Sequence, residues 1–267
     1  MATTTPVMLG PGRRLVEGAE DLAVMTRRDL LVWRRTPAFL VFTLVQPVIF
    51  VLLFRYVFGG AIQVGNAGGY VDYLMPGIIG QTAGFASVAT AIALARGLHK
   101  GVIDRFRSMP MARSAYLGGR LLADTLRMLV TLVVILVVGY AVGFRFHNGI
   151  VPAAAMMALA VLFGLAMCCV SAFIGLAIKD EESVQGFGLI WLFPLTFVSS
   201  VFVPLASMPG WLQAFARNQP VTLVVDTMRS LALGGPVADT GWKALAWLAG
   251  ILVVFVPLSV RAYRTAN

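Results

Sequence analysis

The sequence predicts an all-α, polytopic membrane protein with six transmembrane helices. Of its 267 residues, 59% are hydrophobic and only 12% are charged, and the mean hydropathy is +0.85. Soluble domains carry roughly 25% charged residues, so this chain lacks the polar side chains that a water-exposed surface requires. In addition, apolar runs recur along the chain at about the 20-residue length that crosses a bilayer as a helix.

Each of these runs is expected to be a helix, because a lone segment in lipid must satisfy its own backbone hydrogen bonds. Thr36 followed by Pro37 is a typical helix start and directly precedes the first run. The fourth run is the longest, so we expect it to tilt or to extend beyond the bilayer. The predicted spans are 38–58, 74–94, 121–142, 150–178, 184–203 and 244–260.

The distribution of lysine and arginine predicts the orientation of the chain. These residues concentrate before the first span, between the second and third spans, and after the last span. The positive-inside rule places those segments in the cytoplasm. We therefore expect a multi-pass protein of the plasma membrane with both termini cytoplasmic. The net charge of +9 is explained by these loops, and nucleic-acid binding is not expected.

The N-terminal segment has the pattern of an interface helix. From 13 to 35, apolar residues recur at helical spacing among charged ones, which is typical of an amphipathic helix on a membrane surface. The expected organisation is therefore a cytoplasmic segment, 1–37, followed by a single transmembrane domain, 38–267.

A second amphipathic pattern lies between the second and third spans. Val102, Phe106 and Met109 follow helical spacing, and a proline ends the pattern. Asp104 and Arg105 belong to the opposite, polar face. This short helix is the strongest candidate for contact with a partner. A basic loop that rests on anionic lipid is an equally open interpretation.

The long connection after the fifth span, 204–241, predicts two short helices on the outer side. Trp211 and Phe215 are suited to anchor the first helix at the membrane interface. The second helix starts near a proline, ends at glycine and is expected to dip back toward the bilayer. On it, Asp226 and Arg229 stand three residues apart and can pair on one face. These four residues are candidates for an outer gate, although a simple lid fits equally well.

The sequence lacks the motifs of an energy-converting or catalytic site. None of the three lysines follows a glycine, so the phosphate-binding loop of many ATPases is absent. Neither a zinc-binding His-Glu motif nor a serine nucleophile motif occurs. The charged candidates inside the spans, Asp124 and Arg127, are expected to neutralise each other along one helix. We therefore expect no enzyme activity, no metal and no cofactor in this chain.

Uncharged polar and aromatic residues at hydrocarbon depth are candidates for a transport pathway. They suit a hydrophobic or amphipathic cargo, because no charged group is available there to select an ion. Hydrogen bonding between helices is the alternative role for any one polar residue among them. The candidate pathway residues are Gln46, Gln81, Thr82, Phe85, Phe193, Phe197 and Ser200.

Four segments together carry a family pattern. They are Gln46-Pro47 with the IFVLLFRYVFGGAI that follows, GVIDRFRSMPMARSAYLGGRLLAD at 101–124, EESVQGFGLIWLFPLTFVSS at 181–200, and MPGWLQAFARNQPVTLVVDTMRSLALGGP at 208–236. In these segments the chain resembles the permease subunit of type-2 ABC exporters, in particular the actinobacterial daunorubicin-resistance type. The family often has an acidic residue before the Lys/Arg-Gly pair, and here the chain departs from it with His99.

The resemblance implies a six-span subunit that pairs with a second permease, identical or homologous. It also implies two copies of a cytoplasmic ATP-binding subunit, which bind the ATP and Mg. The helix between spans two and three would be the coupling helix that docks on the ATPase. The residues that it maps onto are Gly101, Val102, Asp104, Arg105, Phe106, Met109 and Pro110.

The predicted function is therefore the membrane half of an ATP-driven exporter of a drug or a lipid, as in antibiotic efflux. One alternative is an exporter of lipid-linked glycan or cell-wall lipid built on the same fold. An alternative from a different class is a membrane scaffold, or a facilitator that is not coupled to ATP.

Overall fold

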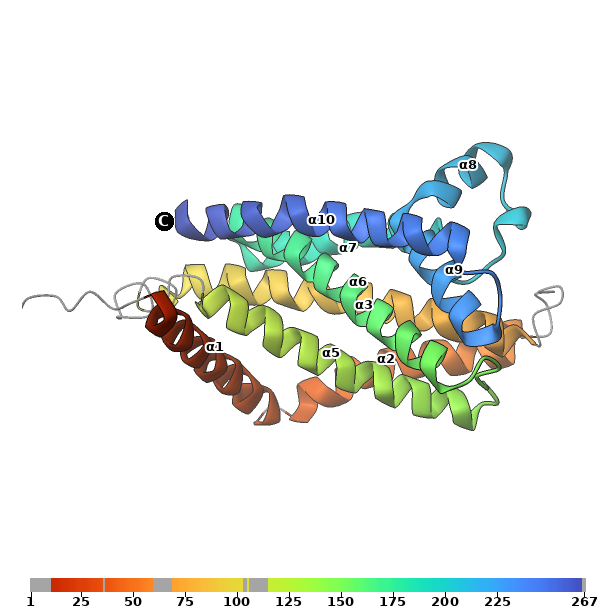
Figure 1. Cartoon of the computed structure of the whole chain (residues 1–267), viewed down its shortest axis with the longest axis horizontal. Coiled ribbons are helices and arrows are strands. Elements are labelled where there is room, and N and C mark those ends of the chain that lie inside the picture. The colour runs from red at the N-terminus through yellow and green to blue at the C-terminus, as the bar shows by residue number, and fades with distance from the viewer. Residues whose placement is uncertain (1–10, 36, 60–68, 103–104, 106–114, 266–267) are drawn as a thin grey trace, which may run out of the picture.

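The computed structural model is a bundle of long helices that run along a common axis (Figure 1). It describes residues 11–35, 37–59, 69–102, 105 and 115–265, and in these residues all regular structure is helical. The predicted all-α class is thereby confirmed. The elements are α1 (Pro11–Arg34), α2 (Pro37–Leu53), the π-helical turn η1 (Phe54–Phe58), α3 (Tyr70–His99), α5 (Ala115–Ala141), α6 (Ile150–Ile178), α7 (Glu181–Phe197), the 3-10 turn η2 (Leu205–Ser207), α8 (Gly210–Asn218), α9 (Pro220–Leu233) and α10 (Ala238–Thr265).

Several of these helices have the length and composition of membrane spans. Within the described residues, α3, α5, α6 and α10 are long and apolar enough to cross a membrane. The two remaining predicted spans correspond to shorter helices, α2 and α7, of 17 residues each. The π-helical turn η1 extends α2 to Phe58, whereas α7 ends at Phe197, six residues before the predicted end of the fifth span. The residues after α7 turn there because their backbone groups bond to α3 instead of continuing the helix: Tyr73 Oη donates to Ser200 O at 2.9 Å.

Helix α3 is the centre of the bundle, and it packs most extensively against α6. Small residues allow the two backbones to approach closely, since a Cβ added to Gly175 of α6 would overlap the carbonyl oxygen of Ala91 in α3. A hydrogen bond of 2.9 Å from Ser171 Oγ to Ser87 Oγ joins the same two helices. Backbone proximity and a satisfied polar pair therefore fix the register of α3 on α6.

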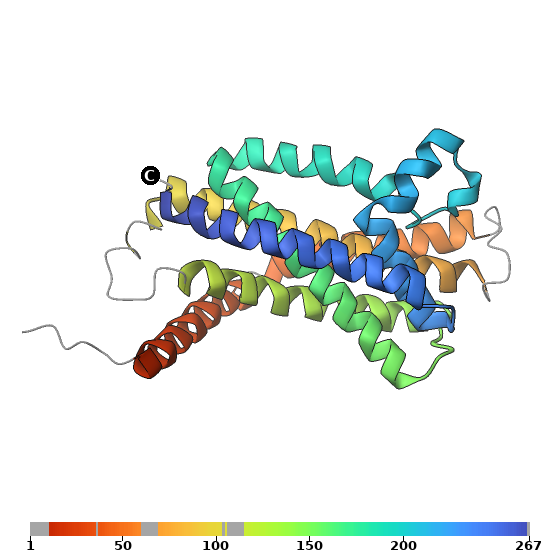
Figure 2. The same cartoon turned by 45° about the horizontal axis from the view of Figure 1, so that its top comes forward.

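Helix α1, predicted over 13–35, runs obliquely to the bundle and rests on α5 (Figure 2). Met25 and Thr26 of α1 are both 6% exposed, and they face Gly119 of α5. A side chain at Gly119 would collide with Met25, so glycine is needed at this crossing. The amphipathic helix therefore buries part of its apolar face on the protein itself.

The two ends of the bundle differ in construction. The start of α1 and the end of α10 lie at one end, and α8 and α9 lie at the other (Figure 1). At the first end, Asp180 caps α7 by accepting a 2.8 Å hydrogen bond from the backbone N–H of Ser183. Hydrogen bonds from the Ser183 hydroxyl and N–H hold the pKa of this carboxyl below its usual value. At the second end, α9 stops at Gly234, which adopts φ +92°, a conformation that favours glycine.

We expect Gly175→Ala to destabilise the bundle, because the new methyl group forces α3 and α6 apart. Overpacking of this kind costs about 1–3 kcal/mol. Thermal unfolding of the purified protein in detergent measures the effect. Gly250→Ala in α10 is the matched control, since nothing lies within 4 Å of its added Cβ. Equal unfolding midpoints for the two variants would contradict the close packing of α3 on α6.

Candidate functional site

A cavity of about 270 Å³ lies between α2, α3 and α5, and we call it the central cavity. Four of the predicted pathway residues line it together: Gln46 from α2, and Gln81, Thr82 and Phe85 from α3. Its other lining residues are Thr43, Pro47, Phe50, Ala86, Ala89, Arg127, Met128 and Thr131. Amide, hydroxyl and aromatic groups thus face one space, a combination typical of small-molecule sites. The charged Arg127 borders the same space, because its helix turns it toward both cavities, so the expectation that no charged group lies along the pathway is wrong at this residue.

A row of phenylalanine rings leads from the central cavity to the end of the bundle that carries α8 and α9. Phe85 meets Phe193 of α7 edge-on at 5.4 Å, and Phe193 stacks on Phe197 at 5.2 Å. Phe197 contacts Phe202 at 5.2 Å, and Phe202 stacks on Phe54 at 4.5 Å. The row returns to the cavity wall through Phe50, 6.0 Å from Phe54. Two of the predicted residues, Phe193 and Phe197, therefore belong to this aromatic row and are about half exposed.

Ser200, the remaining predicted pathway residue, lies in a different environment. It is 2% exposed, and its hydroxyl donates a 2.7 Å hydrogen bond to Asp226 Oδ1. Arg229 contacts the same carboxylate with Nη1 at 2.5 Å and donates from Nη2 to Ser200 O at 2.9 Å. The Arg229 guanidinium also lies 3.6 Å from the centre of the Tyr73 ring of α3. Asp226 and Arg229 therefore form an internal clasp that joins α9 to α3 and to the turn after α7.

The other two candidates for an outer gate, Trp211 and Phe215, lie on α8 and face outward. They are 76% and 56% exposed, respectively. Helix α8 projects from the end of the bundle (Figure 1) and packs mainly on α9 and η2 among the described elements. The four predicted gate residues thus divide into an exposed aromatic pair and a clasp inside the protein.

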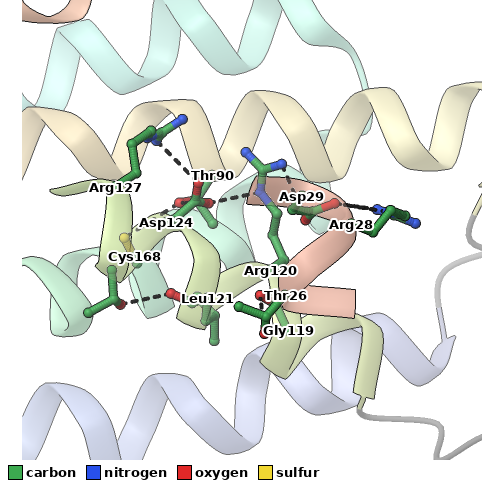
Figure 3. A network of polar contacts seen from close by, with 11 residues as sticks. Thr26, Arg28, Asp29, Thr90, Gly119, Arg120, Leu121, Asp124, Arg127 and Cys168 are labelled. Atoms are coloured by element: carbon green, nitrogen blue, oxygen red, sulfur yellow. Dashed lines mark hydrogen bonds and ion pairs between the residues drawn. The ribbon is translucent and has the colours of Figure 1, made fainter. Parts of the chain in front are cut away.

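Asp124 is the centre of a charged network inside the bundle (Figure 3). It is 4% exposed and accepts hydrogen bonds from Thr90 Oγ1 at 2.7 Å and from Arg120 Nε at 2.8 Å. Its other oxygen lies 3.2 Å from Arg127 Nη2. The predicted pairing of Asp124 with Arg127 is thereby confirmed, but the carboxylate has two further donors that share its charge.

The network continues from α5 to α1. Arg120 Nη1 lies 3.6 Å from Asp29 Oδ2, and Asp29 Oδ1 accepts a 2.6 Å contact from its neighbour Arg28 (Figure 3). The i, i+4 spacing of Arg120 and Asp124 is a signal that the sequence contained. No local pattern indicated that Asp29 and Thr90 would reach the same cluster, because they lie on separate helices.

A second cavity of about 290 Å³, which we call the side cavity, lies between α1, α3 and α5 beside this network. Its wall contains Asp29 and Trp33 of α1 together with Arg120, Asp124 and Arg127 of α5. Arg127 and Ala89 line both cavities, so the two spaces adjoin. The remaining lining residues of the side cavity are Leu30, Val32, Ile92, Ala93, Arg96 and Ala123.

The segment between α3 and α5 is described only at its start. Gly101 has φ +63° and accepts a 3.2 Å hydrogen bond from Arg105 N, while Val102 packs on a cluster that includes Leu94 and Tyr116. The other predicted coupling residues, Asp104, Phe106, Met109 and Pro110, lie outside the described residues. Within the described part of the chain, no group of His, Cys, Asp and Glu side chains could hold a metal ion.

Residues 20–233 match the ABC-2 type transporter family. The chain belongs to this family. It is 34% identical to "Daunorubicin resistance ABC transporter permease protein DrrB1" of Streptomyces coeruleorubidus over 99% of this chain and 96% of that protein. It is 32% identical to "Probable doxorubicin resistance ABC transporter permease protein DrrC" of Mycobacterium tuberculosis over 100% of this chain and 99% of that protein. The resemblance found in the sequence is thereby confirmed, and with its long apolar helices this family member is a multi-pass membrane protein.

Proposed function

We propose that this chain is the membrane-spanning permease subunit of an ATP-driven exporter that moves a hydrophobic or amphipathic molecule outward. The observation that carries the proposal is the central cavity with its aromatic row. Gln46, Gln81 and Thr82 offer hydrogen bonds there, and the row continues from Phe85 with apolar ring surface toward one end of the bundle. The relatives are drug-resistance permeases by name, which supports a drug as the cargo and antibiotic efflux as the role.

The proposed membrane placement has six spans, with α2 and α7 added to the four longer helices. A helix of 17 residues is at the short end of the range that crosses a bilayer. We place the end of the bundle with the start of α1 and the end of α10 in the cytoplasm, where the basic segments also lie. The organisation is then the cytoplasmic segment 1–37 and one transmembrane domain, 38–267.

The proposed complex contains two copies of a cytoplasmic ATP-binding subunit, which bind the ATP and Mg, and a second permease, identical or homologous. Apolar side chains are exposed on α2, which lines the central cavity, and on α7, which carries part of the aromatic row, and they support a permease partner there. Val45 and Ile49 of α2 are 41% and 52% exposed, and Ile190 of α7 is 71% exposed. A second subunit would close the open side of the pathway.

The transport proposal is tested in proteoliposomes that contain the chain with its ATP-binding subunit. We expect ATP-dependent, vanadate-sensitive accumulation of doxorubicin, and no ATP hydrolysis by the chain alone.

Phe193→Ala removes one ring of the aromatic row. An aromatic contact contributes ~1 kcal/mol of interaction free energy, so the variant should transport about fivefold more slowly. Phe187→Ala is the matched control, because Phe187 is equally exposed on α7 but lies outside the row. ATP hydrolysis by the isolated chain would refute the proposal, and the lack of any stable ATPase partner would favour a scaffold.

Phe106→Ala should uncouple ATP hydrolysis from transport while the protein remains inserted in the membrane. An aromatic anchor in an interface contributes ~2 kcal/mol or more, which corresponds to roughly 30-fold weaker binding of the ATPase. Arg105→Ala, at the predicted rim, is expected to have a much smaller effect. Binding is measured by co-purification and coupling by the ratio of transport to hydrolysis. Wild-type values for Phe106→Ala would indicate that the helix lies on lipid instead.

Single cysteines on the proposed dimer face should form crosslinks between subunits in membranes. We expect oxidation to join Val45→Cys with Ile190→Cys when the two variants are expressed together, because both side chains are exposed and α2 and α7 form the proposed dimer face. Ala158→Cys, exposed on the fourth predicted span, is the control. The native Cys168 and Cys169 are 1% and 2% exposed, so they should not react. Crosslinking confined to Ala158→Cys would contradict the arrangement.

A further inference from the structure

We infer that the side cavity binds the phosphate head group of an anionic phospholipid from the membrane leaflet next to α1. The cavity lining combines charged and apolar side chains, which is the chemistry of a head group joined to acyl chains. Arg120 and Arg127 belong to the charged part, and Leu30 and Ile92 belong to the apolar part. The site is separate from the central cavity proposed for cargo, although Ala89 and Arg127 border both.

The charges around the side cavity favour an anion. Three arginines and two aspartates line it. When the ion-pair partners Arg28 and Glu181 are included, arginines still outnumber carboxylates, four to three, among the described residues. Arginine is also the side chain best suited to phosphate, because its planar guanidinium donates two parallel hydrogen bonds.

One of the existing contacts is loose enough for a ligand to replace it. Arg120 Nη1 lies 3.6 Å from Asp29, beyond hydrogen-bonding distance, whereas its Nε is fixed on Asp124 at 2.8 Å. The Arg120 side chain is 19% exposed, and at the mouth of the cavity the Arg96 side chain is 55% exposed. Arg96 is held by Glu181 through Nε at 2.9 Å and Nη2 at 2.8 Å. Arg120 Nη1 is therefore the donor that a phosphate oxygen can engage without breaking the network around Asp124.

Trp33 gives an independent indication of a ligand. Its indole Nε1 is buried and has no hydrogen-bond partner among the described residues, although Trp33 lines the cavity. A buried N–H without an acceptor is costly, and a rotation of the indole toward the cavity would let a phosphate oxygen accept its hydrogen bond. Tryptophan is also typical of the depth at which lipid head groups lie.

The surroundings of the cavity favour a lipid over a free ion. Next to Trp33, Val32 is 60% exposed and Leu31 is 41% exposed, so apolar surface continues from the cavity to the outside of the bundle. Acyl chains can lie on this surface while the head group is inside. The cavity volume of about 290 Å³ is at the lower limit of small-molecule sites, which suits a head group without its chains.

The test uses the fluorescence of Trp33 in the purified full-length chain, titrated with phospholipids brominated on their acyl chains. The fluorescence component that depends on Trp33 is obtained by subtracting the fluorescence of Trp33→Phe from that of the wild type. We expect brominated phosphatidylglycerol to quench this component several-fold more strongly than brominated phosphatidylcholine. Arg96→Gln should reduce that preference about fivefold through the loss of one arginine at the mouth. Arg217→Gln, exposed on α8 at the far end, should leave it unchanged.

Two results would overturn the assignment. Equal quenching of the Trp33-dependent component by the two brominated lipids would show that the side cavity does not select an anionic lipid. Loss of the preference on addition of inorganic phosphate alone would show that the site takes a free anion instead. Neither result depends on transport, so failure of this inference is distinguishable from failure of the proposed function.

Discussion

The close approach of α3 to α6 is the contact on which the other features of this structure depend. Water-driven burial of apolar surface is weak inside a membrane, where packing of small residues and hydrogen bonds between helices stabilise the bundle. Gly175 lets the backbones meet at Ala91, and Ser171 bonds to Ser87 in the same interface. With one side of α3 fixed in this way, its other sides present Gln81 and Thr82 to the central cavity and Thr90 to Asp124.

The buried carboxylate of Asp124 imposes the second constraint. A charge at this depth is expensive unless donors surround it, and here Thr90, Arg120 and Arg127 satisfy it together. Arg120 also reaches Asp29, so the neutralisation of Asp124 on α5 is linked to the position of α1. A displacement of α1 along α5 must therefore change the surroundings of Arg120, which shares Asp124 with Arg127, and Arg127 borders both cavities. The charged network thus gives the interface helix a physical connection to the proposed pathway.

The end of the bundle that carries α8 and α9 combines a fixed helix with an exposed one. Helix α9 is held by the clasp of Asp226 and Arg229 and by Gln219, whose Nε2 donates to Leu195 O and Val198 O at 2.9 Å each. Helix α8 presents Trp211 and Phe215 outward instead. The aromatic row ends beside this fixed part, since Tyr70 Oη bonds to Phe202 O at 3.3 Å. A cargo that follows the row would thus leave the bundle between a rigid wall and an amphipathic helix suited to the membrane interface.

The sequence by itself determined the helical class, the membrane environment, the family and most helix positions, because hydrophobic length and local spacing are properties of neighbouring residues. It also indicated that Asp124 pairs with Arg127 and that Asp226 pairs with Arg229, since each pair stands three apart on one helix. Only the tertiary structure decided which of the polar candidates share a space. Gln46 and Gln81 line the same cavity, whereas Ser200 is hydrogen-bonded to Asp226 in the clasp. Which side chains meet depends on contacts between helices, and small residues determine which helix faces come together. The contact of Asp29 in α1 with Arg120 in α5 is an example.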